Sequence, residues 1–160
     1  MIRSGRGDGA VERDESMKVT REFALYWGTV LLCGYGAVTY GRWGLLELLV
    51  RTGTWPSDWF AFDAYGYVAS MSVLQEVVFV LATICALSAF VLLLLRSRWS
   101  AVMYGVFFFA SMVDWLLLVG NPFIGMGLNG YFGITINLIA LSAVVMITSM
   151  GLLKGRPVQS

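Results

Sequence analysis

The chain has 160 residues, of which 58% are hydrophobic and only 13% are charged. Soluble domains carry about 25% charged residues, so the composition excludes a soluble globular protein and indicates an integral membrane protein in contact with the lipid bilayer. The net charge is +1 with acids and bases interleaved, which excludes a nucleic-acid-binding surface, and histidine is absent, so we expect no metal site, no cofactor and no histidine-dependent catalysis.

The polar first part of the chain, residues 1–20, is rich in glycine and mixed in charge, which predicts a disordered cytoplasmic tail. Four apolar runs follow, at about residues 23–41, 73–95, 101–119 and 131–153. Each has about the 20 residues that cross about 30 Å of hydrocarbon. The sequence therefore predicts an all-α domain over residues 21–153, a bundle of four transmembrane helices, followed by a short tail at residues 154–160.

The basic residues of the connections indicate how these helices are oriented. With four spans, one side of the membrane receives three basic pairs: Lys18 and Arg21, Arg96 and Arg98, and Lys154 and Arg156. Because basic residues favour the cytoplasmic side, we expect both termini in the cytoplasm.

The segment after the first run, RWGLLELLVR, carries Arg42, Glu47 and Arg51 among leucines. Glu47 and Arg51 have the i,i+4 spacing of a helical ion pair. Three charges in ten residues favour a short amphipathic helix on the outer surface. The rival interpretation is one long tilted helix through residue 50, which would put Arg42 inside the membrane.

Each predicted helix places one strongly polar residue in its outer third: Arg42, Glu76, Asp114 and Asn137. Counted from the outer helix ends, the last three lie at depths of about 5 to 9 Å. Ionisable residues in spans usually face the bundle interior, so one hypothesis is an outward-facing pocket for a cation, a proton, a small molecule or a lipid headgroup. The alternative is that Arg42 and interfacial water only neutralise the two carboxylates. No nucleophile motif or metal-ligand spacing accompanies them, so we expect no catalytic residues.

A glycine-rich first span, an early glutamate in the second (Glu76) and the basic turn LLLLRSRWSAV before an aromatic third span resemble small four-helix bacterial inner-membrane proteins of the broad DoxX-like type. The resemblance covers roughly residues 23–150. It implies the four-helix architecture and the bacterial inner membrane, and some members of that group resemble accessory subunits of quinone-linked oxidoreductases.

Two functions follow as hypotheses. The first is a non-catalytic accessory subunit that packs beside a larger membrane protein complex, or self-associates. The second is a binding or transport protein that uses the outward-facing pocket.

Overall fold

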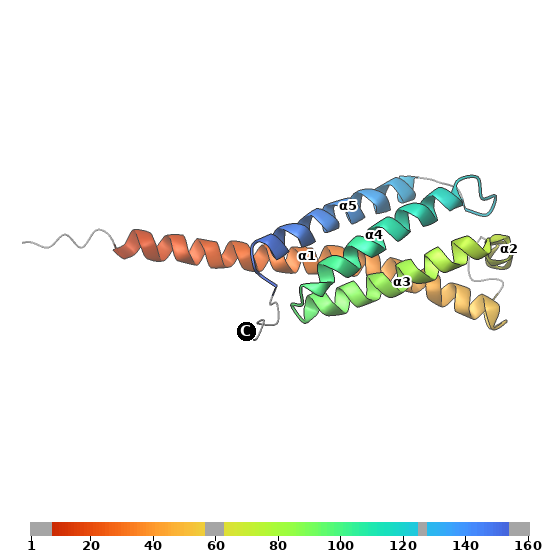
Figure 1. Ribbon diagram of the computed structural model, residues 1–160, viewed down its shortest axis with the longest axis horizontal. Coiled ribbons are helices and arrows are strands. Elements are labelled where there is room, and N and C mark those ends of the chain that lie inside the picture. The colour runs from red at the N-terminus through yellow and green to blue at the C-terminus, as the bar shows by residue number, and fades with distance from the viewer. Residues whose placement is uncertain (1–7, 57–62, 125–127, 154–160) are drawn as a thin grey trace, which may run out of the picture.

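The computed structural model describes residues 8–56, 63–124 and 128–153, and in these ranges the chain forms helices joined by short connections, with no strand. The helices are α1 (Asp8–Arg51), α2 (Ala64–Ser70), α3 (Val73–Leu94), α4 (Trp99–Leu118) and α5 (Leu128–Ser149). The predicted all-α class is confirmed. Figure 1 shows four long helices lying side by side, with the short α2 at one end.

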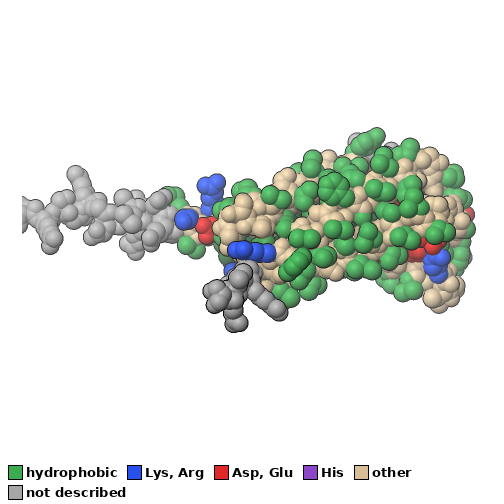
Figure 2. Space-filling view, in the orientation of Figure 1, with side chains coloured by type: hydrophobic (Ala, Val, Ile, Leu, Met, Phe, Trp, Pro, Cys, Tyr) green, Lys and Arg blue, Asp and Glu red, His purple; other side chains and the backbone are tan. Residues whose placement is uncertain are grey.

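Three of these helices, α3, α4 and α5, are long and apolar enough to cross a membrane. Their bounds agree with the last three predicted runs to within about four residues. The side chains on their outer faces are apolar and strongly exposed, as at Val73, Phe109 and Leu116, each 70% exposed or more. On the face shown in Figure 2, apolar side chains cover the length of the bundle and charged ones gather toward its two ends. The chain is therefore an integral membrane protein.

The helix α1 is one unbroken helix of 44 residues, which differs from two predictions. The separate amphipathic segment expected on the outer surface is not formed, because the helix continues through Arg42 and Glu47. The reason is packing: a Cβ added at Gly41 or Gly44 would lie 3.7 Å from Leu87 or 3.4 Å from Thr83, so α1 stays pressed against α3 through this segment.

At its other end α1 reaches back to Asp8, so residues 8–20 are helical where a disordered tail was predicted. Glutamate, arginine, lysine and methionine are good helix formers, so this segment can continue the helix that packs against α3 and α5. In Figure 1 this first part of α1 projects past the other helices. Residues 1–7 and the tail at 154–160 lie outside the described residues.

Among the described residues, the four long helices pack as a ring. Helix α1 contacts α3 and α5, and α4 also contacts α3 and α5, so α1 and α4 face each other across the centre. Helices α1 and α3 run antiparallel. Their contacts proceed from Tyr26 with Leu93, through Gly34 with Phe90, to Arg51 with Glu76.

One end of the ring is fixed by the basic turn between α3 and α4. The Arg96 guanidinium lies 4.7 Å from the centroid of the Tyr26 ring, and the Tyr26 hydroxyl donates to the Leu93 carbonyl at 2.8 Å. Arg98 Nε donates to the Leu153 carbonyl at 3.4 Å. The turn therefore ties together α1 at Tyr26, the end of α3 and the segment after α5.

The opposite end is covered by α2, whose Ala64, Tyr67 and Val68 are buried. The connection after α4 lies on top of it: Asn121 Nδ2 donates to Ser70 Oγ at 3.0 Å, and the Phe123 ring lies directly over Gly66. This double layer closes the end of the ring at which α3 begins.

Candidate functional site

An ionic group joins α1 to α3 at the end covered by α2. The guanidinium of Arg51 lies 2.8 Å from the Glu47 carboxylate and 2.7 Å from the Glu76 carboxylate. The Glu47 side chain is 11% exposed and that of Glu76 is 34% exposed. The i,i+4 pair predicted between Glu47 and Arg51 is thus confirmed, and Glu76 receives its cation from Arg51 rather than from Arg42.

Asp114 lies at the centre of the ring, where α4 faces α1. It is buried, and the Tyr40 hydroxyl donates to its Oδ2 at 3.3 Å. The Tyr40 ring is held between Phe79 of α3, at a centroid distance of 5.9 Å, and Phe107 of α4, at 5.1 Å. The other carboxylate oxygen of Asp114 has no hydrogen-bond partner among the described residues, and the same is true of Nε2 of the buried Gln75.

Asn137 takes part in a second, separate contact. The Tyr104 hydroxyl donates to Asn137 Oδ1 at 3.4 Å, and both side chains are buried. A Cβ added at Gly36 would lie 3.3 Å from the same oxygen, so the glycine allows α1 to approach α5 here. Asn137 and Asp114 bond to different tyrosines, and α1 passes them at Gly36 and Tyr40, which are four residues or about 6 Å apart.

At the end of the ring nearest Asp114, described residues cover this carboxylate, which is 4% exposed. Tyr67 of α2 is 5% exposed. Burial raises the pKa of its phenol, and the carboxylates of Asp114 and Glu47 raise that pKa further. These effects keep Tyr67 in its neutral, proton-bearing form, between the central carboxylate and the outside.

Arg42 lies on the outward face of α1, away from all of these groups. Its side chain is exposed, and neither of the ion pairs between described residues includes it. The flanking Gly41 and Gly44 contact Leu87 and Thr83, so Arg42 is level with the middle of α3. It lies nine residues, or about 13 Å, from Arg51.

The neighbours of Arg42 on this face form what we call the Arg42 stripe. Every member is exposed, and the spacing of three or four residues places all of them on one side of α1. Apart from Arg42 itself, the stripe carries no charge. Its members are Trp27, Leu31, Tyr35, Val38, Arg42 and Leu45.

The four polar residues singled out in the sequence are thus distributed over four environments. Glu76 pairs with Arg51, Asp114 bonds to Tyr40, Asn137 bonds to Tyr104, and Arg42 faces outward. No hydrogen bond or ion pair in the described ranges joins any two of them. Within the same ranges, no three His, Cys, Asp or Glu residues lie close enough to hold a metal ion.

Sequence reasoning missed the tyrosines that bond to the buried polar groups. Tyr104 carried a partial signal, because it lies on the same face of its helix as Asp114 and Ser111. Tyr40 carried none, because the first helix was expected to end one residue later. Arg51 was identified as the partner of Glu47, but its second partner, Glu76, depends on how α1 and α3 are aligned.

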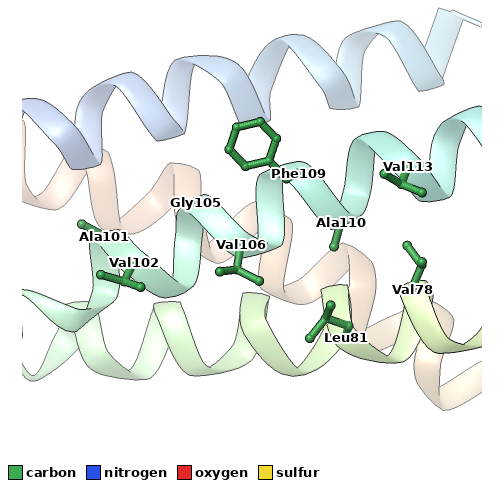
Figure 3. A pocket seen from close by; sticks show the side chains of 9 residues that line it. All are labelled: Val78, Leu81, Ala101, Val102, Gly105, Val106, Phe109, Ala110 and Val113. Carbon is green, nitrogen blue, oxygen red and sulfur yellow. The ribbon is translucent and has the colours of Figure 1, made fainter.

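A shallow groove of about 520 Å³ runs along the outer surface between α3 and α4. Figure 3 shows Val78 and Leu81 of α3 on one side and residues of α4, from Ala101 to Val113, on the other. All of its lining side chains are apolar. A Cβ added at Gly105 would have no described atom within 4 Å apart from the backbone of its own helix. The groove is therefore open at this position. Its chemistry suits a hydrocarbon chain or an apolar helix and provides no polar recognition.

Comparisons of the chain with protein-family models, with curated proteins and with solved structures find no match. The resemblance to DoxX-like proteins therefore stays a prediction, and function has to be argued from the geometry alone.

Proposed function

We propose that this chain is a non-catalytic accessory subunit that packs beside a larger membrane protein complex. The observation that carries the proposal is the position of Arg42, an exposed cation that has no ion pair among the described residues and lies in the middle of an otherwise apolar helix face. In a protein that worked alone in the membrane, this arginine would face lipid without an opposite charge beside it, which is costly.

The membrane position of α1 is the first step of the argument. Because α1 lies antiparallel along α3 from Tyr26 to Arg51, and α3 is apolar enough to cross a membrane, α1 is proposed as a fourth span. Its glycines and tyrosines make it less apolar than the other three. Four spans, with the basic end in the cytoplasm, agree with both termini being cytoplasmic and with the DoxX-like resemblance and its bacterial inner membrane.

The second step concerns the surroundings of Arg42 in such a bilayer. The middle of α3 corresponds to the hydrocarbon core, where an arginine facing lipid is costly. Charged residues in spans nearly always face a protein interior, and they pair there. Arg42 faces away from the interior of this chain, which is filled by the tyrosine contacts of Asp114 and Asn137. A second protein packed against this face would give Arg42 a protein environment instead of lipid. The length of the Arg42 stripe, about 27 Å from Trp27 to Leu45, suits packing against a whole helix.

Native mass measurement after extraction in a mild detergent tests the proposal. We expect the tagged chain to co-purify with another membrane protein in fixed stoichiometry. Val38→Trp, in the Arg42 stripe, should reduce that co-purification, because a bulkier side chain pushes the partner away. Ile84→Trp on the exposed face of α3 is the matched control and should leave it unchanged. A lone chain, or an oligomer of this chain only, would contradict the accessory role.

The second function, binding or transport of a small cation, proton or small molecule, is favoured by one observation: the buried Oδ1 of Asp114 has no partner in the described part of the chain. Tyr67 closes that end of the ring, so a ligand would require α2 to move. Asp114→Asn should abolish binding or uptake of the ligand if this function holds, with Glu76→Gln as a control that removes a carboxylate already paired with Arg51. Equal activity of Asp114→Asn and the unaltered protein would contradict it.

A further inference from the structure

We propose that Arg42 forms an ion pair with a carboxylate on a transmembrane helix of a different protein. This inference rests on the proposed accessory function and specifies the chemistry of the partner. The argument for it is that this chain places none of its own carboxylates beside Arg42 at the same level of the membrane.

The chain has no spare acid for this purpose. The proposed spans and the residues next to them, 23–56 and α3 to α5, contain three acidic residues. These are Glu47, Glu76 and Asp114. The first two bind Arg51 at the end covered by α2, about 13 Å from the level of Arg42. Asp114 is buried in the centre of the ring against Tyr40. The remaining acids lie in residues 1–22 and 57–63, outside the proposed spans.

A second copy of the chain cannot supply the missing charge. Copies inserted in the same orientation have Arg42 at the same depth, so pairing through the Arg42 stripe would place two cations opposite each other. Like charges in a low-dielectric setting repel strongly. The partner must therefore be a different chain, and it must carry a negative charge near the middle of its own span.

Lipid headgroups are also a poor match. Lysine and arginine near helix ends extend their side chains toward the interface, but Arg42 is nine residues from the outer end of α1. That separation of about 13 Å exceeds the length of an arginine side chain. An aspartate or glutamate in a partner helix meets the guanidinium at its own level, with charge-assisted hydrogen bonds that are strongest in a dry setting.

The apolar neighbours define how the partner helix would lie. Val38 and Leu45 are one turn before and one turn after Arg42, and they are 70% and 54% exposed. They would pack against apolar residues one turn on either side of the partner's carboxylate. The expected partner segment is thus a transmembrane helix with one Asp or Glu near its centre.

Site-specific photocrosslinking in the source cells tests this. A photoreactive amino acid replaces Val38 in the full chain, and Ile84 in a control, and the crosslinked peptides are sequenced. We expect a product at position 38 only, from a transmembrane segment with an Asp or Glu within one turn of the crosslink. Arg42→Glu should lower the yield about thirty-fold, as expected for breaking a desolvated charge pair. Arg42→Lys should retain most of it, and reversing the partner's carboxylate to lysine should restore the yield of Arg42→Glu.

The outcomes separate the two proposals. A partner segment without a carboxylate, or an unchanged yield with Arg42→Glu, overturns the ion pair and leaves the accessory function standing. A product containing only a second copy of this chain or lipid overturns both. Arg42 is exposed, so its variants should fold; thermal unfolding of each purified variant, followed by circular dichroism, checks that a lost crosslink is not a lost fold.

Discussion

The ionic group of Arg51 offers a quantitative test, because one cation serves two carboxylates of different burial. The perturbation is Arg51→Leu, which leaves Glu47 with an 11% exposed and unpaired side chain. Leaving a buried charge without its partner typically costs a few kcal/mol. Since the Arg51 side chain is itself 44% exposed, water screens part of that cost, and we expect a loss of about 2 kcal/mol in the free energy of unfolding.

The second carboxylate should matter less. Glu76 is 34% exposed, so Glu76→Gln breaks a largely solvated pair and should cost about 0.5 to 1 kcal/mol. The double variant Glu47→Gln with Arg51→Leu removes the unpaired charge and should recover much of the stability lost in Arg51→Leu.

Unfolding with sodium dodecyl sulfate in mixed micelles, followed by circular dichroism, measures these differences. Two results would refute the reasoning. One is an equal loss in Arg51→Leu and Glu76→Gln, which would mean that burial does not separate the carboxylates. The other is a double variant no more stable than Arg51→Leu, which would mean that the unpaired Glu47 is not the source of the loss.

Three further variants can be measured by the same unfolding assay. Tyr40→Phe removes the hydroxyl that donates to Asp114 and should lower the free energy of unfolding by about 1 to 2 kcal/mol. Adding Asp114→Leu to this variant should restore most of that stability, because both polar partners are then absent. No recovery would argue that the carboxylate has another partner. Gly66→Ala places a methyl group against the Phe123 ring and the Asp63 carboxylate and should cost about 1 to 3 kcal/mol, of which Phe123→Ala in the same chain should recover only a part. A neutral Gly66→Ala would show that the outer layer is loosely packed. Ser72→Ala removes the hydroxyl that accepts from the Gln75 backbone N–H at the start of α3 and should lower the free energy of unfolding by about 1 kcal/mol. The control is Ser142→Ala, at an exposed position, which should leave that free energy nearly unchanged.

The helices α3, α4 and α5 could be predicted from the sequence because hydrocarbon thickness requires long uninterrupted apolar runs, and polar turns separate those runs. The basic turn at Arg96 and Arg98 marks one boundary clearly. Helix α1 could not be predicted in the same way. Its charges at Glu47 and Arg51 have the pattern of an interfacial helix, and only the alignment of α1 with α3 shows that Arg51 holds Glu76 at the end of a continuous helix.

The candidate site could be predicted only in part, for a related reason. Counting residues from helix ends gives a depth only if the helices begin at one level. Helix α5 begins at Leu128 rather than at residue 131, and Asn137 bonds to Tyr104 while Asp114 bonds to Tyr40. The residue types were informative, since each polar residue in a span does have a specific environment. The residue types did not indicate which of these residues lie together, because that depends on how the helices are shifted along one another.

The contrast between the buried polar groups and Arg42 bears on the proposal that the chain has a partner. Asp114 and Asn137 each bond to a tyrosine from a different helix, so they hold the ring together from within. Arg42 contributes nothing of that kind, because it faces outward, and a leucine there would lower the cost of insertion. An ion pair with a carboxylate of the proposed partner would offset that cost.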